Sequence, residues 1–446
     1  MKMKFRRTSL KFRYVEFIVK NSRLVGRREI ALVMALICWS MPSIAATPSM
    51  EEIWAVVQLQ QAKIDKLEAE LTSSQHRLEE AQLRLSRQNE LQQDQIAETE
   101  VAIEQAVSAI ESTMQGSSDS TFGGYGELHY NNLDSKDEID LHRFVLFFSH
   151  QFSEELSFFS ELEVEHGIAG EGKVGEVEIE QAFIQWDYAD NHRAKAGVFL
   201  LPIGLINETH EPDTFFGIER NGVEKNIIPA TWWEGGVALD GEITPGWSYD
   251  LAIHSGLRLD TDNTSSSKRS SIRSARQKVG KAAADNLAYT ARLRFNGIPG
   301  VQWNTSFQYQ SDLSQGDVDG IGIDEIDATL FETSLDYRSG GFGLRALYAR
   351  WDIDNEIETL NPGSDEQVGW YIEPSYRFGK VGLFTRFGQY DLTASSGTTS
   401  NEQEQLDIGV NYWLHENVVL KMDYQIQDND NNSDNDGFNL GVGYSF

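Results

Sequence analysis

Cysteine is almost absent from this chain. Its one cysteine, Cys38, lies in an N-terminal apolar segment that we expect the mature protein to lose. A mature chain without a thiol has no disulfide, cysteine nucleophile or thiolate metal site. Positive charge is also scarce, because 38 Lys and Arg stand against 69 Asp and Glu, a net charge of −31. This negative field argues against nucleic-acid binding.

Residues 1–45 have the features of a signal peptide. A basic stretch through Arg27 and Arg28 precedes the apolar run 30–39, and small residues at 43–45 offer a cleavage site. That run is too short for a permanent span, and no later apolar stretch of about 20 residues predicts a transmembrane helix. Since the segment holds ten basic and two acidic residues, the mature chain carries a net charge of −39.

Residues 48–115 predict a periplasmic α-helical coiled coil. The stretch 50–114 contains no proline or glycine, and its apolar residues recur at heptad spacing, at Val57, Ile64, Leu67, Leu71, Leu78, Ala81 and Leu85. An 11-residue step, which is a heptad plus a four-residue stutter, then leads to Ile96, Ile103 and Ile110. We expect a parallel oligomer, and the alternative is a solvated helical linker without a partner.

From Phe122 onward the apolar period changes to two, which is typical of strands with one apolar and one polar face. Sixteen strands are predicted, at 122–130, 138–150, 156–166, 176–188, 193–200, 233–242, 247–257, 285–295, 301–310, 326–338, 342–352, 367–378, 381–392, 403–414, 418–428 and 437–446. Short connections alternate with long ones such as 201–232 and 258–284. This pattern predicts an all-β transmembrane barrel of 16 antiparallel strands over 122–446, with short periplasmic turns and longer outer loops.

The polar face of these strands predicts a water-filled interior. In strand 301–310, Trp303 and Phe307 point to one face while Asn304 and Gln308 point to the other. A charged or polar set cannot face lipid without a penalty of a few kcal/mol per charge. A barrel of this size leaves a channel that side chains of the wall alone do not fill.

Two segments resemble the phosphate- and pyrophosphate-selective porins of Gram-negative outer membranes, the O and P type. The hairpin 409–425 (GVNYWLHENVVLKMDYQ) is similar to that family's penultimate hairpin, and 195–204 (KAGVFLLPIG) resembles its stretch before the third loop. The resemblance implies a trimeric porin of 16 strands with inward-folded loops. Leu200 stands where the family pattern often has a basic residue, so the resemblance carries the architecture and not the substrate.

Charged residues on the inward face are the candidate pore-lining groups. The cations are Lys195, Arg292, Arg294, Arg345, Arg377, Arg386 and Lys421. The anions are Glu161, Glu163, Glu165, Glu332, Asp336, Glu373, Asp407 and Asp423. Opposing charges create a transverse field across a pore and tune its ion preference. The alternative is that they only pair with each other and hydrate the lumen.

The fourth outer loop is unusually basic for so acidic a chain. It carries Lys268, Arg269, Arg273, Arg276, Lys278 and Lys281. Folded into the mouth of the barrel, these cations would attract anions. The alternative is a flexible loop that contacts lipopolysaccharide phosphates or solvent.

The remaining signals are weaker. The acidic stretch 428–437 has oxygen ligands at close spacing but lacks the closing Glu of an EF-hand, so we expect a solvated turn and no metal site. Trp232 and Trp233 suit an interfacial girdle or, alternatively, packing in a core or loop. His129 and His142 can meet across the first hairpin as ordinary polar residues. No catalytic motif and no cofactor site is recognised.

These observations predict an outer-membrane porin for passive diffusion of small hydrophilic solutes or ions, with a relation to anions or phosphate left open. The second hypothesis is a structural anchor whose coiled coil tethers the barrel toward the cell wall. The expected partners are outer-membrane lipid, lipopolysaccharide, the diffusing solutes and two further copies of the chain.

Overall fold

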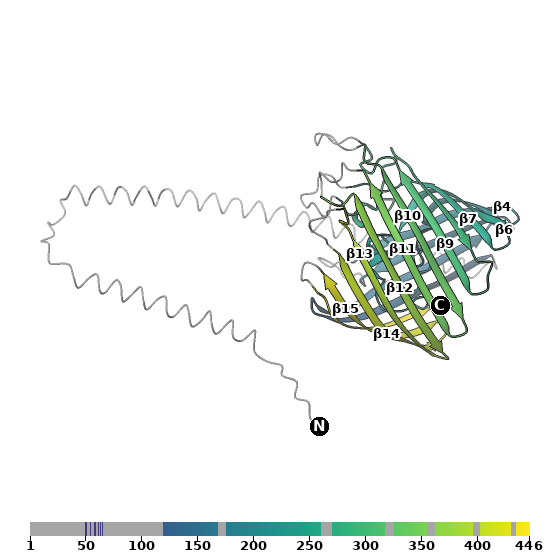
Figure 1. Cartoon of the computed structure of the whole chain (residues 1–446). Coiled ribbons are helices and arrows are strands. Elements are labelled where there is room, and N and C mark those ends of the chain that lie inside the picture. The colour runs from purple at the N-terminus through teal and green to yellow at the C-terminus, as the bar shows by residue number, and fades with distance from the viewer. Residues whose placement is uncertain are drawn as a thin grey trace, which may run out of the picture. The chain divides into compact units, whose positions relative to one another are not determined.

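The second part of the chain folds into a closed, antiparallel β-barrel of 16 strands (Figure 1). The computed structural model describes residues 50, 54, 58, 61, 63, 65, 119–167, 175–259, 270–316, 325–354, 362–395, 402–429 and 434–446. The strands are β1 Ser120–Leu133, β2 Asp137–Gln151, β3 Leu156–Glu165, β4 Val177–Ala189, β5 His192–Leu200, β6 Trp233–Thr244, β7 Trp247–His254, β8 Ala288–Phe295, β9 Val301–Gln310, β10 Ala328–Ser339, β11 Phe342–Ile353, β12 Glu366–Phe378, β13 Val381–Asp391, β14 Gln403–His415, β15 Val418–Asn429 and β16 Gly437–Ser445. Each strand pairs with its neighbours in sequence, as the alternation of short and long connections predicts.

The barrel closes between its first and last strands. β1 pairs with β16 from Tyr125 opposite Ser445 to Leu133 opposite Gly437. The backbone N–H of Gly124 donates to the C=O of Phe446 at 3.0 Å, and the N–H of Phe446 donates back at 2.9 Å. Closure therefore leaves neither β1 nor β16 with an open edge.

All 16 predicted strands are present, and their bounds agree closely with the prediction. The largest difference is at β1, which was predicted over 122–130 but extends over 120–133. β7 and β8 were predicted to extend over 247–257 and 285–295 but are shorter by three residues each. Gly256 adopts a positive φ of 72°, which turns the chain out of the sheet after β7. The side chain of Gln310 then takes the place of a neighbouring strand, because it accepts from the N–H of Leu257 at 2.9 Å and donates to its C=O at 2.8 Å.

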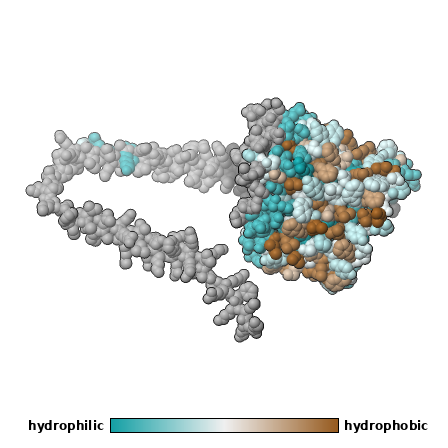
Figure 2. Space-filling view, in the orientation of Figure 1, coloured by the Kyte–Doolittle hydropathy of each residue, from teal (hydrophilic) through white to brown (hydrophobic). Residues whose placement is uncertain are grey.

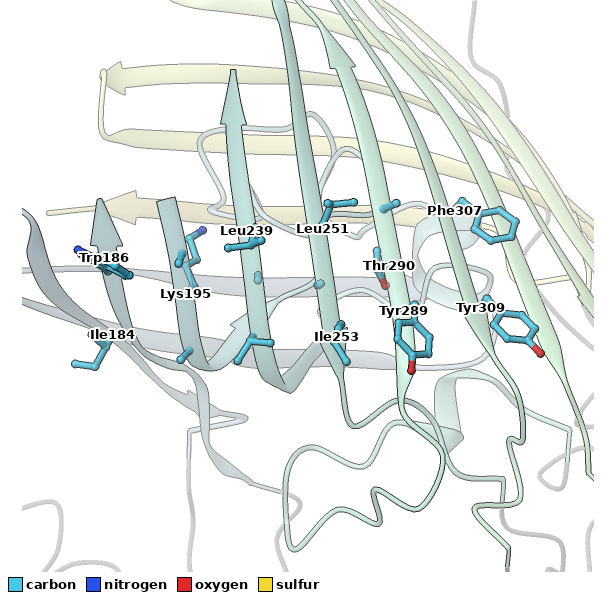
Figure 3. Close-up of a pocket in the computed structure, with 16 residues that line it drawn as sticks. Ile184, Trp186, Lys195, Leu239, Leu251, Ile253, Tyr289, Thr290, Phe307 and Tyr309 are labelled. Atoms are coloured by element: carbon cyan, nitrogen blue, oxygen red, sulfur yellow. The ribbon is translucent and has the colours of Figure 1, made fainter. Parts of the chain in front are cut away.

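Large apolar side chains are exposed on the outer wall of the barrel, and on the face shown in Figure 2 they lie among residues of intermediate hydropathy. A shallow groove of about 660 Å³ on this wall is lined almost entirely by apolar side chains of six consecutive strands, β4 to β9. Figure 3 shows Ile184, Leu239, Ile253 and Phe307 spread over this surface. The polar partners in the alternation, such as Asn304 and Gln308, are buried inside. The prediction of outward apolar and inward polar faces is confirmed for these strands.

None of the helices among the described residues is both long enough and apolar enough to span a membrane.

A hydrophobic core lies inside the barrel. It joins Ile203, Val223 and Trp232, which come from the connection between β5 and β6, to inward-facing Leu347 and Trp351 of β11. Further members come from the connections after β7 and β9, including Leu257, Ile272 and Leu313. Loop segments, and not water alone, therefore fill part of the interior.

The chain divides into two compact units, residues 1–91 and 92–446. The predicted signal peptide lies outside the described residues, and so does almost all of the predicted coiled coil. The six described residues of that region, 50, 54, 58, 61, 63 and 65, are helical and exposed.

Candidate channel constriction

The connection between β5 and β6, here loop 3 (residues 201–232), lies inside the barrel. Most of its residues are buried, and its short helix α3, Gly222–Asn226, is capped by the side chain of Asn221, which accepts from the N–H of Glu224 at 2.9 Å. The apolar residues of loop 3 explain its position, because Ile227 and Trp232 have no exposed surface once they pack against β11. The indole of Trp351 also donates to the C=O of Ile227 at 2.8 Å.

Buried polar side chains fix the shape of loop 3. The Asn207 amide closes its base, because Nδ2 donates to the C=O groups of Leu201 and Trp232 and Oδ1 accepts from the N–H of Trp232 at 2.7 Å. The Glu224 carboxylate accepts from two backbone N–H groups of the loop and from the hydroxyl of Tyr371 at 2.6 Å. Buried backbone groups are thereby paired without a regular helix or sheet.

The tip of loop 3 crosses to the opposite wall. Its carbonyl groups at 214–219 accept hydrogen bonds from inward-facing side chains of β11, β13, β14 and β15, namely Arg345, Arg386, Asn411 and Lys421. In return, the N–H of Ile218 donates to Asp423 at 2.8 Å. The loop therefore narrows the lumen across its width.

Three of the predicted pore-lining cations hold the tip of loop 3 in place. Lys421 is 5% exposed, donates to the C=O of Gly217 at 2.8 Å and lies 3.8 Å from the ring centre of Phe215. Arg386 donates to two loop carbonyls, and Arg345 donates to the C=O of Thr214 at 3.0 Å. These side chains point inward as predicted, but they face protein and not an open lumen.

Among the described residues, the remaining predicted cations form no hydrogen bond with the tip of loop 3. Arg292 is buried and pairs with Glu208 of loop 3 and with Asp250, and Arg294 lies within 4 Å of the same two carboxylates. Lys195 lies 3.9 Å from Asp240. Arg377 stacks over Trp413 at the end of β12 that leads into the short turn to β13.

Three of the eight predicted pore-lining acids form ion pairs with these cations. Glu373 and Asp407 flank Arg386 at 3.2 and 2.8 Å, and Asp336 pairs with Arg345 at 3.0 Å. Asp423 accepts from Asn439 at 2.8 Å and from loop 3, and Glu332 is fully buried. Glu161 and Glu163 are buried on β3, whereas Glu165 at its end faces a cavity.

The connection between β7 and β8, here loop 4 (residues 255–287), brings part of its basic segment onto loop 3. Arg273 donates to the carbonyls of Lys225 and Ala230 at 2.8 and 3.0 Å, and Arg276 donates to that of Thr231. Lys278 pairs with Glu176 and Glu178, whereas Lys281 is exposed. Lys268 and Arg269 lie outside the described residues.

A cavity of about 270 Å³ lies at this junction, lined by β1, β2, β3, loop 3 and loop 4. Its charged residues are Lys136, Arg143, Arg220, Lys225 and Arg273, with Glu138, Asp140, Glu165 and Glu219. The sequence analysis missed Arg143 and Arg220. Arg143 lies on the inward face of β2, so alternation could have identified it, but no periodic pattern extends to Arg220 in loop 3.

Repulsion between guanidinium groups characterises this junction. Burial and the neighbouring Arg276 and Arg220 lower the pKa of Arg273 to about 9. Burial and Arg220 likewise lower the pKa of Arg276. The Nε and Nη2 atoms of Arg220 have no hydrogen-bond partner among the described residues. An anion at this place would relieve the repulsion.

Two aromatic predictions have clear outcomes. The rings of His129 and His142 stack at 4.5 Å across the first hairpin, as predicted. The interfacial position of Trp232 and Trp233 was wrong, and the alternative of packing holds, because both are buried and the Trp232 indole donates to Glu234 at 3.0 Å. Trp232 precedes β6, where the chain is still inside the barrel.

Comparisons with known proteins agree with this architecture. The family model described as Gram-negative porin matches residues 244–433. An uncharacterized protein of Aquifex aeolicus is 29% identical over 355 residues, which cover 73% of this chain and 80% of that protein. The family match supports a Gram-negative porin, and with it a channel in the outer membrane.

Solved structures share the fold at low sequence identity. The OmpF protein of Salmonella typhi, in complex with daunomycin, is 14% identical with a TM-score of 0.53, over 74% of this chain and 97% of that one. The anion-selective porin of Comamonas acidovorans is 12% identical with a TM-score of 0.52, over 74% of this chain and 99% of that one. At this identity the likeness concerns the fold alone.

Proposed function

We propose that this chain is an outer-membrane porin for passive diffusion of small hydrophilic solutes, with a preference for small anions. The observation that carries the channel is the folding of loop 3 across a closed barrel of 16 strands. Such a loop narrows the lumen to a constriction and leaves the barrel wall intact. The match of residues 244–433 to Gram-negative porins supports the same function.

The preference for anions rests on the guanidinium groups of Arg220, Arg273 and Arg276. The mature chain is strongly acidic, so the bulk field by itself favours cations. At a constriction, however, nearby groups determine which ion passes, because charges act more strongly there than across bulk water. Arg273 lines the cavity, and Arg220 offers guanidinium N–H groups without a partner among the described residues. Inorganic phosphate fits such donors by charge and geometry.

Reversal potentials in planar bilayers test this function. The purified full-length protein in a potassium chloride gradient should conduct with a reversal potential of the sign for anions. The double variant Arg273→Gln/Arg276→Gln should shift the potential toward cations. Lys281→Gln is the matched control, since it removes an exposed charge of the same loop and should leave the potential unchanged.

Two results would contradict the proposal. A cation preference in the unchanged protein would refute the role of the guanidinium groups but not the channel. Failure to conduct, by protein whose folding is verified by a heat-dependent shift in electrophoretic mobility, would refute the channel and favour the structural anchor.

A further inference from the structure

Three side chains from separate elements meet inside the barrel wall. They are Glu161 of β3, Glu180 of β4 and His210 of loop 3, and each is at most 2% exposed. His210 Nε2 lies 3.6 Å from Glu161 Oε1 and 3.4 Å from Glu180 Oε2. The three atoms all lie within 4.8 Å of one another. The facing atoms, His210 Nε2, Glu161 Oε1 and Glu180 Oε2, have no hydrogen-bond partner among the described residues.

A β-bulge places the two carboxylates side by side. The register between β3 and β4 shifts after Glu161, which pairs with Gln181 while Leu162 pairs with Ile179, so Glu180 is the extra residue. Glu180 and Gln181 can therefore both approach Glu161, where regular alternation would turn one of them outward. Gln181 Nε2 donates to Glu161 Oε2 at 2.7 Å, which leaves Oε1 to face the histidine.

The other nitrogen of His210 is already occupied. Nδ1 lies 3.1 Å from the C=O of Asn207, and since a carbonyl only accepts, Nδ1 carries the proton. In the neutral ring, Nε2 then presents a lone pair to the two carboxylates. A backbone carbonyl on one ring nitrogen with the other nitrogen directed at acidic oxygens is the usual setting of a metal-binding histidine.

We propose that Glu161, Glu180 and His210 bind a divalent transition-metal ion that fastens loop 3 to the barrel wall. One imidazole and two carboxylates are donors that Zn²⁺ accepts, whereas Ca²⁺ prefers oxygen alone. Ligand atoms about 2.0–2.2 Å from a tetrahedral metal lie roughly 3.3–3.6 Å apart, which is the spacing of Nε2 from both oxygens here. Water would supply a further ligand.

The competing occupant of the site is a proton. Burial lowers the pKa of His210, but the attraction of the Glu161 and Glu180 carboxylates outweighs it and raises the pKa to about 10. An imidazolium would nevertheless draw one carboxylate to about 2.7–2.9 Å. Instead, Nε2 stands between two oxygens at more than 3.3 Å, and both oxygens lack another donor. A dication satisfies both carboxylates at once, whereas one N–H satisfies one.

In the described part of the chain, the ion pairs of the neighbouring side chains leave the carboxylates of this group without a cationic partner other than His210. Glu163 is buried beside this group, and its Oε1 lies 3.5 Å from Arg143 Nη1. Arg143 is shared with Glu127, whose Oε1 is 2.6 Å from Nε. Among the described residues, this guanidinium forms its ion pairs with Glu127 and Glu163, and none with Glu161 or Glu180.

Metal content of the full-length protein tests the site. Protein purified from membranes, dialysed against Zn²⁺ at neutral pH and then freed of loose metal, should retain about one Zn²⁺ per chain by elemental analysis. The variants His210→Asn and Glu180→Gln should each lose most of this zinc. His415→Asn, in an exposed periplasmic turn, is the matched control and should keep it.

A second group could bind zinc by itself and must be separated. Asp140, His142 and His166 form it at the cavity above loop 3, and their ligand atoms also lie within 4.8 Å of one another. Zinc that is lost in His142→Asn and kept in His210→Asn would place the metal there and overturn the proposal.

A spectroscopic measurement, which does not depend on counting zinc ions per chain, tests the site even if one variant folds poorly. Co²⁺ bound to an imidazole and carboxylates absorbs visible light, and Glu180→Gln should remove this band in protein that passes the electrophoretic test of folding. No zinc and no cobalt band in the unchanged protein would overturn the proposal and identify His210 as an imidazolium. Conductance does not enter these measurements, so their outcome is independent of the porin function.

Discussion

At the residue scale, Glu219 connects the chemistry of the lumen to pH. Its carboxylate lies 3.3 Å from His129 of β1 and joins loop 3 to the first strand. Burial raises the pKa of Glu219, but the hydrogen bond from His129 and the charge of Lys225 outweigh it and bring the pKa well below 4.5. A carboxyl with a depressed pKa stabilises the docked loop above its usual pKa, and this contribution is lost as the pH falls through the lower value.

We therefore expect the part of the single-channel conductance that depends on Glu219 to stay constant from neutral pH down through the ordinary pKa of a glutamate, and to change only in stronger acid. Glu219→Gln, which cannot titrate, should lack that acid transition. Recording conductance against pH for both proteins checks the prediction. A transition at the ordinary glutamate pKa, or one that the variant retains, would contradict it.

Lys421 allows a second test at this scale. Its ammonium donates to the C=O of Gly217 in the tip of loop 3, and a hydrogen bond to a charged group contributes about 1.5–3 kcal/mol. Lys421→Met should loosen the tip and increase open-channel noise in bilayer recordings. Lys380→Met is the control, because Lys380 donates to the C=O of Leu414 at the same distance of 2.8 Å but lies in the short turn between β12 and β13. Equal noise in both variants would mean that the tip does not depend on Lys421.

At the scale of elements, strands were predictable and loops were not. Alternation identifies a strand because it repeats along the whole length of the strand, from eight residues in β7 to fifteen in β2. Loop 3 has no such period, so its path across the lumen could not be derived from its residues. Alternation therefore predicted the inward direction of Arg386 and Lys421. It could not identify the carbonyls of loop 3 that accept their hydrogen bonds. Glu180 escaped notice because the bulge breaks the alternation that would have placed it.

Shortening loop 3 tests its role as the constriction. Replacing residues 211–219 by two glycines removes the carbonyls that meet Arg345, Arg386 and Lys421, while the base closed by Asn207 remains. Single-channel conductance should rise severalfold, because the narrowest part of the lumen is then absent. The heat-dependent shift in electrophoretic mobility verifies that the barrel still forms. An unchanged conductance would place the constriction elsewhere.

At the scale of the whole molecule, the sequence predicts that three copies assemble through two kinds of interface. The heptads of 57–85 precede β1, and the predicted periplasmic start of β1 suits a helix on that side. Three parallel helices would raise the effective concentration of three barrels, so that each weak interface strengthens the other. Glutamine at Gln60 and Gln88 weakens the seam and can set its register.

We expect the full-length protein to be a heat-modifiable trimer, and the isolated segment 48–115 to be helical and at least partly trimeric. Sedimentation equilibrium measures both masses, and circular dichroism measures the helix. A protein without residues 48–115 should form a weaker trimer that dissociates at lower temperature, since one of two coupled interfaces is lost. A monomeric full-length protein would refute the assembly. A segment that stays monomeric and unfolded at high concentration would refute the coiled coil alone, because the walls of the barrels can associate without it.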